Sequence, residues 1–324
     1  MTDYYLGIDG GGTKTQAVIL DASGRLVGTG VSGSSNFGYI GVEQTIQNIG
    51  EAVTIAANDA GVSSESFASA FLGLAGVVSR ADRDIVTGIG KTLKLAPDAF
   101  LGVDHDCRVA LAGGLGGAPG IVQIIGTGTS CFGMNANGER WMAGGWGSLI
   151  ADEGGGYWMG VQAMKAATEA YDTRGKPTLL KQAVLDSLGI SEIGQIMHRV
   201  YTQQISVAET AALGRLVIET AREGDQVALA IINAGMKEVA RCVEAVANYL
   251  AFPQDSLRLT CVGGITQAGD IVMQSLTAAV HQRIPDCQIE TPRFTPAIGA
   301  GLLAIQQHQG KLSSTVIKHL NASL

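Results

Sequence analysis

The stretch LGIDGGGTKT, residues 6–15, decides the fold of this chain. An apolar lead-in ends in Asp9, three consecutive glycines follow, and the chain then enters the aliphatic run Thr15–Leu20. Runs rich in β-branched and aliphatic side chains favour strands over helices. The stretch therefore predicts a strand, a glycine turn and a second strand.

The glycine turn indicates an anion-binding site. Glycines 10–12 allow several backbone N–H groups to approach a phosphate without interference from a Cβ atom, and Thr13 and Lys14 add a hydroxyl and a positive charge. Asp9 beside such a turn is suited to hold a hydrated Mg²⁺, which prefers oxygen ligands and keeps several waters. An ordinary glycine-rich hairpin explains this stretch, taken alone, equally well.

Two better-known glycine loops do not fit. In a Walker A loop a lysine directly follows the last glycine; here Gly7 and Gly12 have the right spacing, but Thr13 and Lys14 stand in the wrong order. A dinucleotide-binding fingerprint requires a glycine where Asp9 stands. The turn is therefore of a different kind.

Length and composition bound the class of protein. The chain has 324 residues, of which 46% are hydrophobic and 16% charged, so it is long enough for two well-packed domains. A net charge of −7 argues against a nucleic-acid partner. The five cysteines are scattered without a C-x-x-C pair, which is typical of a reducing compartment. We find no signal peptide and no apolar run of membrane-spanning length, and therefore expect a cytoplasmic protein without a membrane partner.

The opening pattern recurs in the middle of the chain. The run Gly120–Ile125 leads into a second glycine turn, Gly126–Ser130, and a further apolar run, Cys131–Met134. A repeated strand, turn and strand predicts a duplicated unit, and two phosphate-binding turns predict a nucleotide held in the cleft between two like domains. The recurrence favours ATP as the ligand of the first turn.

The segments between these turns predict an α/β architecture. After a third strand at 25–32, helices and strands alternate, which indicates a mixed sheet covered by helices. The expected helices are 42–60, 81–95, 106–112 and a long one from about 226 to 250, and the expected strands are 69–75, 100–104, 139–142, 257–262 and 288–290. Residues 176–224 read as helical without recognisable chemistry, and a helix at 297–307 closes the fold. We predict one domain from 1–117 plus roughly 297–324, and a second from 118–296 with a helical insertion.

Two further glycine-rich segments carry candidate ligand contacts. The segment Gly144–Gly156 contains Trp146 and Asp152 and leads into a helix, so it could present backbone and carboxylate groups to a polar ligand. A plain helix N-terminus with favourable acidic residues is the alternative. The pair Gly263–Gly264 after a strand could let a purine lie against bare backbone, or could simply start a helix.

Taken together and in order, these pieces resemble the sugar kinase/Hsp70/actin superfamily, and within it the N-acetylglucosamine kinase and BadF/BadG/BcrA/BcrD ATPase family. The resemblance covers essentially the whole chain. It implies an α/β protein of two ribonuclease H-like (actin/hexokinase-type) domains, with mixed sheets and an interdomain cleft for ATP and sugar. It also suggests a homodimer. The matching pieces are Asp9–Lys14, Ser35-Asn36, Asp106, Gly126–Ser130, Gly144–Gly147, Asp152–Gly154 with Tyr157-Trp158, and Gly263-Gly264.

The resemblance also assigns roles to individual residues. It implies that Gly11, Gly12 and Thr13 hold the ATP phosphates together with Thr127, with Lys14 beside them, and that Gly263 and Gly264 lie by the nucleoside. The residues implied to contact the sugar are Asn36, Asp106, Thr129, Ser130, Gly145, Trp146, Gly147 and Asp152. Asp106 matches the family's catalytic base, while Asp104, at a strand end, competes with it on sequence grounds alone.

The implied reaction is transfer of the ATP γ-phosphoryl group to a sugar hydroxyl, usually O6, with ATP and Mg²⁺ required. N-acetylglucosamine is the expected sugar, and glucosamine, N-acetylmuramate and glucose are the alternatives within the family. An alternative from another class is a BadF-type ATPase activator that carries an iron–sulfur cluster. That role needs cysteines converging on one cluster, and the spacing of these five does not indicate one.

Overall fold

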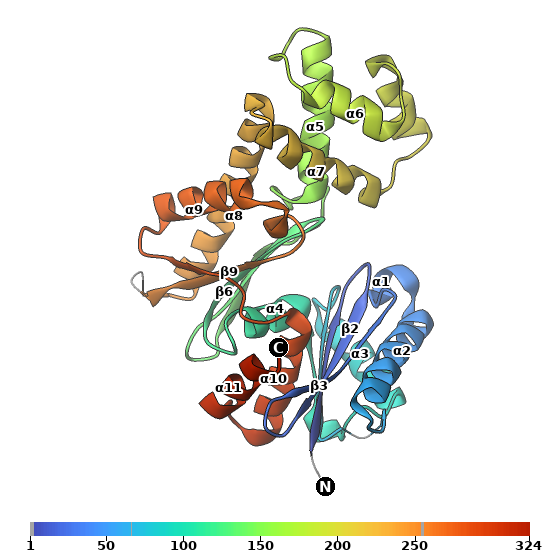
Figure 1. Ribbon diagram of the computed structural model, residues 1–324, viewed down its shortest axis with the longest axis vertical. Coiled ribbons are helices and arrows are strands. Elements are labelled where there is room, and N and C mark those ends of the chain that lie inside the picture. The colour runs from blue at the N-terminus through green and yellow to red at the C-terminus, as the bar shows by residue number, and fades with distance from the viewer. Residues whose placement is uncertain (1–2, 66, 254–255) are drawn as a thin grey trace. The chain divides into compact units, whose positions relative to one another are not determined.

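The computed structural model describes residues 3–65, 67–253 and 256–324. The chain forms two compact units, one from Met1–Ala118 with Thr291–Leu324 and the other from Pro119–Glu290. Figure 1 shows the elements of both units. Among the described residues, no helix combines the length and the apolar character that a membrane crossing requires.

The first unit is a five-stranded mixed sheet in the order β3-β2-β1-β4-β5. Strands β1 and β2 form the predicted antiparallel hairpin around the glycine turn, β3 continues it, and β4 and β5 add in parallel to β1. The strands are β1 (Tyr4–Gly10), β2 (Thr15–Asp21), β3 (Leu26–Ser32), β4 (Ser69–Leu74) and β5 (Leu101–His105). The five strands predicted for this part of the chain are confirmed.

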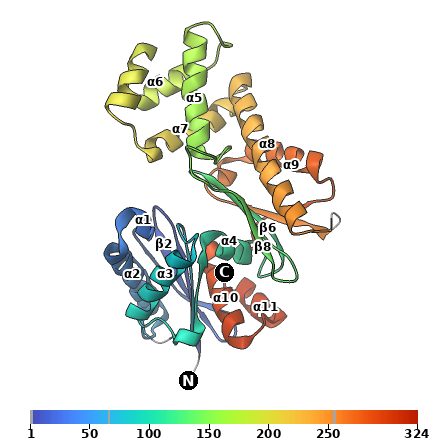
Figure 2. The ribbon, with the colours of Figure 1, turned by 180° about the vertical axis from the view of Figure 1, so that it is seen from behind.

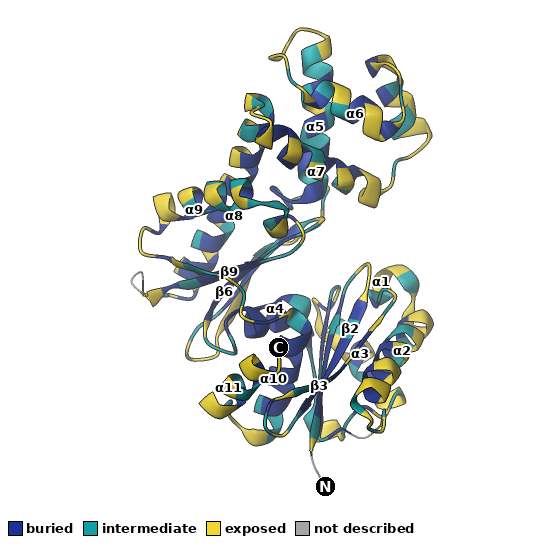
Figure 3. Ribbon diagram, viewed as in Figure 1, coloured by how far each residue is buried: buried dark blue, intermediate teal, exposed yellow. Residues whose placement is uncertain are grey.

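Helices cover both faces of this sheet. One face carries α1 (Phe37–Ile40), α2 (Val42–Ala60) and α3 (Arg80–Thr92), and the other carries α4 (Asp106–Gly114), α10 (Pro296–Gln309) and α11 (Ser314–Ser323), as the two opposite views show (Figures 1 and 2). Helix α10 is buried along most of its length (Figure 3). The sequence did not predict α1 or α11.

Glycines bring the layers of the first unit close together. A Cβ atom at Gly7 in β1 would collide with the backbone of Gly301 in α10, and one at Gly30 in β3 would collide with the carbonyl oxygen of Ala52 in α2. Glycine removes that obstacle and lets a helix backbone rest on the sheet. Close packing between layers therefore accounts for part of the high glycine content.

The second unit repeats the topology of the first. Read from its β8 edge, its sheet has the order β8-β7-β6-β9-β10, which is again third, second, first, fourth and fifth strand in chain order, with antiparallel β6, β7 and β8 and parallel β6, β9 and β10. The strands are β6 (Gly120–Ile125), β7 (Thr129–Met134), β8 (Arg140–Gly144), β9 (Arg258–Val262) and β10 (Gln288–Glu290). The predicted duplication of a mixed-sheet unit is confirmed.

The second unit differs in its helical insertion. The helices are α5 (Gly156–Tyr171), α6 (Leu180–Leu188), α7 (Val207–Arg222), α8 (Gln226–Tyr249) and α9 (Asp270–Arg283). Helix α8 packs on the sheet, and α5 packs on α7 through small residues, because a Cβ at Gly160 would collide with the carbonyl oxygen of Thr210. The small residues Gly160, Ala163 and Ala167 of α5 are buried.

Candidate active site

Strand register gathers acidic residues at one edge of the first sheet. Asp9 of β1 pairs with Gly73 of β4, and Gly73 pairs with Asp104 of β5, so the three residues form one row. Because β1, β4 and β5 are parallel, their carboxyl ends meet at the same edge, where open α/β sheets bind their ligands. The glycine turn and the start of α4 lie at this edge.

The glycine turn between β1 and β2 is braced by the segment that follows β3. The N–H of Gly11 donates to the carbonyl oxygen of Lys14 at 3.0 Å, and the carbonyl of Gly11 accepts from the Ser35 N–H at 3.1 Å and from the Ser34 hydroxyl at 3.0 Å. Thr13 and Lys14 are exposed. The turn is therefore held by its own hydrogen bonds and by neighbouring residues, and its outer side faces solvent.

The fold requires only one of the three turn glycines. A Cβ at Gly10 would collide with the Ser35 hydroxyl, whereas a Cβ at Gly12 would meet no atom within 4 Å and one at Gly11 only an ordinary contact at 3.9 Å. Neither Gly11 nor Gly12 has a positive φ that would favour glycine. Neither packing nor backbone conformation therefore explains why residues 11 and 12 are glycine. The open space beside them suits a ligand that approaches the backbone.

Asp9 has the electrostatics of a cation ligand. Burial, and then the negative charge of Asp106, raise the pKa of Asp9 to about 7, although Lys14 opposes the shift. Two neighbouring carboxylates at a water-poor edge offer the oxygen ligands that Mg²⁺ prefers, and a bound cation would favour the charged form of both. The residues present therefore fit the predicted magnesium site.

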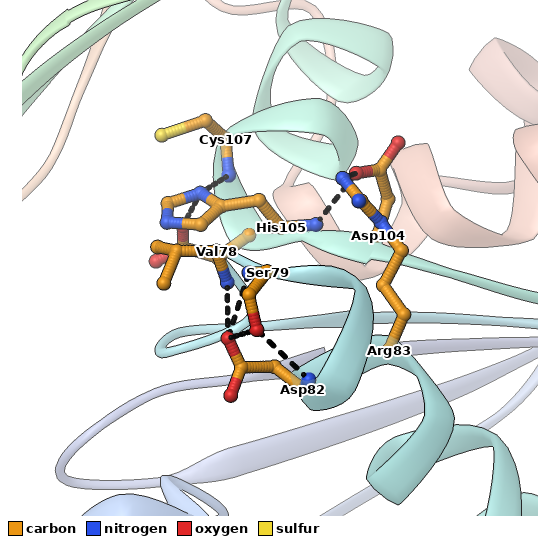
Figure 4. Close-up of polar contacts among 8 residues, drawn as sticks. Val78, Ser79, Asp82, Arg83, Asp104, His105 and Cys107 are labelled. Atoms are coloured by element: carbon orange, nitrogen blue, oxygen red, sulfur yellow. Dashed lines mark hydrogen bonds and ion pairs between the residues drawn. The ribbon is translucent and has the colours of Figure 1, made fainter.

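The two candidate bases, Asp104 and Asp106, occupy different environments. Asp104 is buried, and its Oδ1 accepts hydrogen bonds from Arg83 Nη2 at 3.2 Å and from the His105 N–H at 2.9 Å (Figure 4). Asp106 is the first residue of α4, its side chain is 26% exposed, and its charge acts on Asp9. Asp104 is thus held in an ion pair with Arg83. Asp106 instead lies near Asp9, the candidate magnesium ligand.

Asn36 lies near the same edge. Its Oδ1 caps the short helix α1 by accepting from the Gly38 N–H at 3.2 Å, and a Cβ at Gly76, two residues beyond β4, would come within 3.2 Å of the same oxygen. The first unit therefore brings together, at one edge of its sheet, Asp9, the glycine turn, Asn36 and Asp106.

The second glycine turn is docked against a helix N-terminus. The carbonyl oxygens of Gly126 and Thr127 accept hydrogen bonds from the N–H groups of Gly156, at 2.8 Å, and Tyr157, at 2.9 Å. Nothing lies within 4 Å of a Cβ built at Gly126. The turn is thus rigidly attached to α5, and its Gly126 is free of packing constraints, as Gly12 is in the first turn.

Asp152 sits over this turn in a strained, buried position. Its φ of +68° is rare for a residue with a side chain, and a Cβ at Gly128 would collide with its Oδ2. Burial raises the pKa of Asp152, while hydrogen bonds from the backbone N–H groups of Thr129, Gly147 and Gly145 oppose that shift. Its other oxygen, Oδ1, is buried and has no hydrogen-bond partner among the described residues.

A buried acceptor without a donor is costly unless a ligand supplies one. Strain in the backbone and an orphaned oxygen at one residue are typical of a binding site. The structure therefore brings Asp152 together with Thr129, Gly145 and Gly147, four of the residues predicted to contact the sugar. Ser130 lies beside Gly145, and Trp146 projects into solvent with 75% of its surface exposed.

Beside the second unit's sheet lies a pocket that the sequence did not reveal. Its volume is about 300 Å³, and its walls are Arg215, Ile218, Glu219 and Arg222 of α7 with Gly264, Gln267 and Ala268. Only Gly264 was predicted as a site residue. The six others were missed because arginine and glutamate on a helix normally indicate a solvated face.

The two glycines at this pocket have different reasons to be glycine. Gly263 has a φ of +113°, and a Cβ there would collide with the carbonyl oxygen of Ile125, so the fold itself requires it. A Cβ at Gly264 would meet no atom within 4 Å. A short 3₁₀-helix at Thr266–Ala268 follows this pair, and α9 begins only at Asp270. Gly264 faces the pocket and is left open for a ligand.

The duplicated mixed-sheet topology is the fold of the actin and hexokinase type. A sequence profile of the BadF/BadG/BcrA/BcrD ATPase family matches residues 6–304, and the chain belongs to that family.

The chain is also similar to proteins that are named as sugar kinases. The chain is 30% identical over 304 residues to the N-acetylmuramic acid/N-acetylglucosamine kinase of Clostridium acetobutylicum, covering 93% of this chain and 98% of that protein. It is 27% identical to the N-acetyl-D-glucosamine kinase of Dictyostelium discoideum, covering 94% and 98%. A solved structure from Chromobacterium violaceum, provisionally named as an N-acetylglucosamine kinase, is 27% identical with a TM-score of 0.75, covering 93% of this chain and 99% of that one.

Proposed function

We propose that this chain is an ATP-dependent kinase that phosphorylates an amino sugar, most simply N-acetylglucosamine at its O6 hydroxyl. The observation that carries the proposal is the recurrence of one strand topology with an open glycine turn at the same place in both copies. Each turn exposes backbone where packing does not require glycine. Such turns suit the phosphates of a nucleotide.

Phosphoryl transfer depends mainly on positioning the reactants and on neutralising the charge of the phosphates. Different residues of the chain would meet these two requirements. Gly11, Gly12 and Thr13 of the first turn and Thr127 of the second would hold the phosphates, with Lys14 adding a positive charge. Mg²⁺ near Asp9 would neutralise phosphate charge. Asp106 would accept the proton of the attacking hydroxyl.

The second unit would supply nucleoside and sugar contacts. The pocket beside Gly264 has room for a nucleoside, and Arg215 and Glu219 in its walls offer a hydrogen-bond donor and acceptors. The orphaned Oδ1 of Asp152 would accept a hydrogen bond from a sugar hydroxyl. Asn36, Thr129, Ser130, Gly145, Trp146 and Gly147 would complete the sugar site.

The names of the relatives support an amino sugar as the substrate. The Clostridium relative is named for N-acetylmuramic acid as well as N-acetylglucosamine, and a Vibrio cholerae relative, 33% identical over 170 residues, is named a glucosamine kinase. N-acetylmuramate and glucosamine are therefore included as candidate substrates. We also propose a cytoplasmic homodimer, which sedimentation equilibrium would test.

A coupled ADP-release assay across sugars tests the proposal. We expect Mg²⁺-dependent turnover with N-acetylglucosamine, none with its 6-deoxy analogue, and none without sugar. If N-acetylmuramate or glucosamine were turned over in preference, that sugar would replace N-acetylglucosamine as the proposed substrate. The proposed reaction, phosphorylation of a sugar by ATP, would stand. ATP hydrolysis without any acceptor, together with visible absorbance after anaerobic purification, would instead favour an iron–sulfur activator.

A further inference from the structure

One cation at the carboxyl edge of the first sheet has no role in the proposed reaction. Arg83 lies in the first turn of α3, which follows the loop after the carboxyl end of β4. Its Nη2 donates to Oδ1 of Asp104 at 3.2 Å, and Asp104 lies in β5, two residues before Asp106. Figure 4 shows the arginine reaching from α3 to Asp104. Arg83 therefore stands near the candidate catalytic carboxylate and is bound to a different one.

The guanidinium of Arg83 is held on one side and open on the other. Asp104 is only 6% exposed, whereas the side chain of Arg83 is 45% exposed. Among the residues that the structure describes, Asp104 is the one hydrogen-bond partner of Arg83, so most of the five N–H donors of the guanidinium remain available. The buried carboxylate thus fixes the head group, and the exposed side offers donors to a ligand.

The backbone that carries Arg83 is fixed as well. The Ser79 hydroxyl accepts from the Asp82 N–H at 3.2 Å, and Oδ2 of Asp82 accepts from the N–H groups of Ser79, at 2.7 Å, and Val78, at 3.2 Å (Figure 4). This capping box anchors the first turn of α3. Because the backbone and the head group are both held, Arg83 would lose little conformational freedom on binding a ligand.

The start of α3 also lies beside a residue proposed to contact the sugar. A Cβ at Gly76, in the loop between β4 and α3, would come within 3.2 Å of Oδ1 of Asn36. Asn36 and Asp106 are the sugar contacts proposed for this unit, and both stand at the same edge as this loop. Lys14, the other cation placed at the edge, is assigned to the phosphates. Arg83 is thus the cation left for a charged group on the sugar.

A fixed guanidinium with available donors suits a carboxylate, which arginine binds through two parallel N–H···O bonds. Among the candidate sugars, only N-acetylmuramate carries a carboxylate. It belongs to an acidic ether on C3, two ring carbons away from the carbon that bears C6. A cation that binds this group must therefore stand to one side of the base that faces O6, as Arg83 stands to one side of Asp106.

We infer that Arg83 is a specificity-determining residue, which binds the carboxylate of a C3-linked acidic ether and so admits N-acetylmuramate as a substrate as well as N-acetylglucosamine. The inference rests on the proposed kinase function and names the substrate class of that site. Arg83 takes no part in bond formation. With either sugar the γ-phosphoryl group passes to O6, ADP leaves, and Asp106 accepts the hydroxyl proton.

A comparison of N-acetylmuramate with its uncharged carboxamide tests this contact. The ratio of the two kcat/KM values reports on the carboxylate alone, because any general damage to a variant affects both sugars. Since Asp104 already balances the charge of Arg83, we expect the wild type to prefer the acid only about tenfold, equivalent to roughly 1.4 kcal/mol. Arg83→Gln should show no preference. Arg83→Lys should keep part of it, because lysine retains the charge and loses the planar fork.

Arg80→Gln is the matched control. Arg80 is an exposed arginine in the same turn of α3, so its substitution removes the same formal charge from the same helix. This variant should keep the wild-type ratio. Calorimetric titration of the acid and the carboxamide, in the presence of ADP and Mg²⁺, repeats the comparison without turnover. Thermal unfolding verifies that each variant is folded.

The failure of this inference can be told apart from the failure of the proposed function. An unchanged ratio in Arg83→Gln, or an equal loss of preference in Arg80→Gln, would overturn the role of Arg83. A wild type that phosphorylates N-acetylglucosamine but does not prefer the acid to its carboxamide would also overturn it, and the kinase function would stand. A folded wild type that phosphorylates no sugar would overturn the proposed function and this inference with it.

Discussion

At the scale of single residues, Asp104 and Asp106 show how two aspartates two positions apart acquire different roles. Both stand at the carboxyl end of β5, but Asp104 points into an ion pair with Arg83, and Asp106 opens α4 beside Asp9. A buried carboxylate that already accepts hydrogen bonds from an arginine and a backbone N–H is poorly placed to accept a substrate proton. The prediction of Asp106 as the base therefore gains a geometric argument.

Asp106→Asn should lower kcat by roughly 10²- to 10⁴-fold, the usual contribution of a positioned base, while ATP binding survives. Asp104→Asn is the matched control: it should retain more activity and lose thermal stability instead. Steady-state kinetics and thermal unfolding of both proteins check this. Near-normal turnover in Asp106→Asn with loss in Asp104→Asn would reverse the assignment.

The raised pKa of Asp9 predicts that the folded protein becomes less stable as pH rises. The pKa of Asp9 is raised from 3.8 to about 7, so between these pH values the folded state holds a proton that the unfolded chain has released. Stability therefore falls as pH rises from about 4 to 7, by at most on the order of 4 kcal/mol, three pKa units at about 1.4 kcal/mol each. The buried charge above pH 7 is the cause.

Asp9→Asn removes that charge. In chelator and without nucleotide, the variant should unfold at a higher temperature than the wild type at pH 8, and the gain should shrink toward pH 5, where wild-type Asp9 is already protonated. Activity should be lost at both pH values. A stability difference that does not change between pH 5 and pH 8 would contradict the raised pKa.

At the scale of elements, glycines divide into those that the fold needs and those that it leaves open. Gly160 of α5 belongs to the first class, because a Cβ would collide with the backbone of Thr210 in α7. Gly12 and Gly264 belong to the second, because a Cβ at either meets nothing within 4 Å. The same residue type thus serves packing at one place and ligand access at another.

Gly160→Ala should destabilise the protein by about 1–3 kcal/mol, the usual cost of overpacking. Gly88→Ala is the control, because Gly88 lies on the exposed side of α3 with open space around it. There alanine should be neutral or stabilise by up to about 1 kcal/mol, since it restricts the unfolded chain. Chemical denaturation measures both. Equal effects would show that α5 can move away from α7.

Gly12→Ala and Gly264→Ala should leave the unfolding temperature nearly unchanged and raise KM for ATP by about tenfold, equivalent to losing roughly 1.4 kcal/mol of binding. The added methyl group would occupy space next to the phosphates in one case and the nucleoside in the other. Kinetics with ATP as the varied substrate checks this. Unchanged KM values in stable variants would remove these turns from the nucleotide site.

At the scale of the whole molecule, two separate cores stabilise the chain. The principal buried cluster of the second unit draws on residues from Ile121 to Cys287, and the clusters of the first unit draw on its sheet, α2, α3 and α10. The clusters identified among the described residues each lie within one unit. Two cores of this kind allow the units to unfold at different temperatures.

Without ligands, calorimetry should show two transitions, or one whose calorimetric enthalpy exceeds its van't Hoff enthalpy. Mg²⁺·ATP analogue with sugar should raise both components and bring them together, because ligands that bind the native state stabilise whatever holds them. If the ligands stabilised only one of the two transitions, we would conclude that they bind to one unit alone.

The sequence by itself determined the order of the elements. Glycine turns flanked by β-branched runs, at residues 6–20 and 120–134, locate both hairpins because strand propensity and turn geometry act over a few residues. The local signal also marked Asp9 and Gly12 as candidates, because a carboxylate beside a glycine turn suits a phosphate and its cation, whereas Asp106 was singled out by the family resemblance. It did not predict α11, which lies beyond the last recognised motif.

Tertiary structure alone decided which side chains meet. Packing of α7 against the segment after β9 turns Arg215 and Glu219 from an apparently solvated face into the wall of a pocket with Gly264. Strand register and burial separate Asp104 from Asp106, bring His105 to Asp106, and leave one oxygen of Asp152 without a donor. Proximity and desolvation depend on contacts between segments far apart in the chain, and local sequence patterns do not encode those contacts directly.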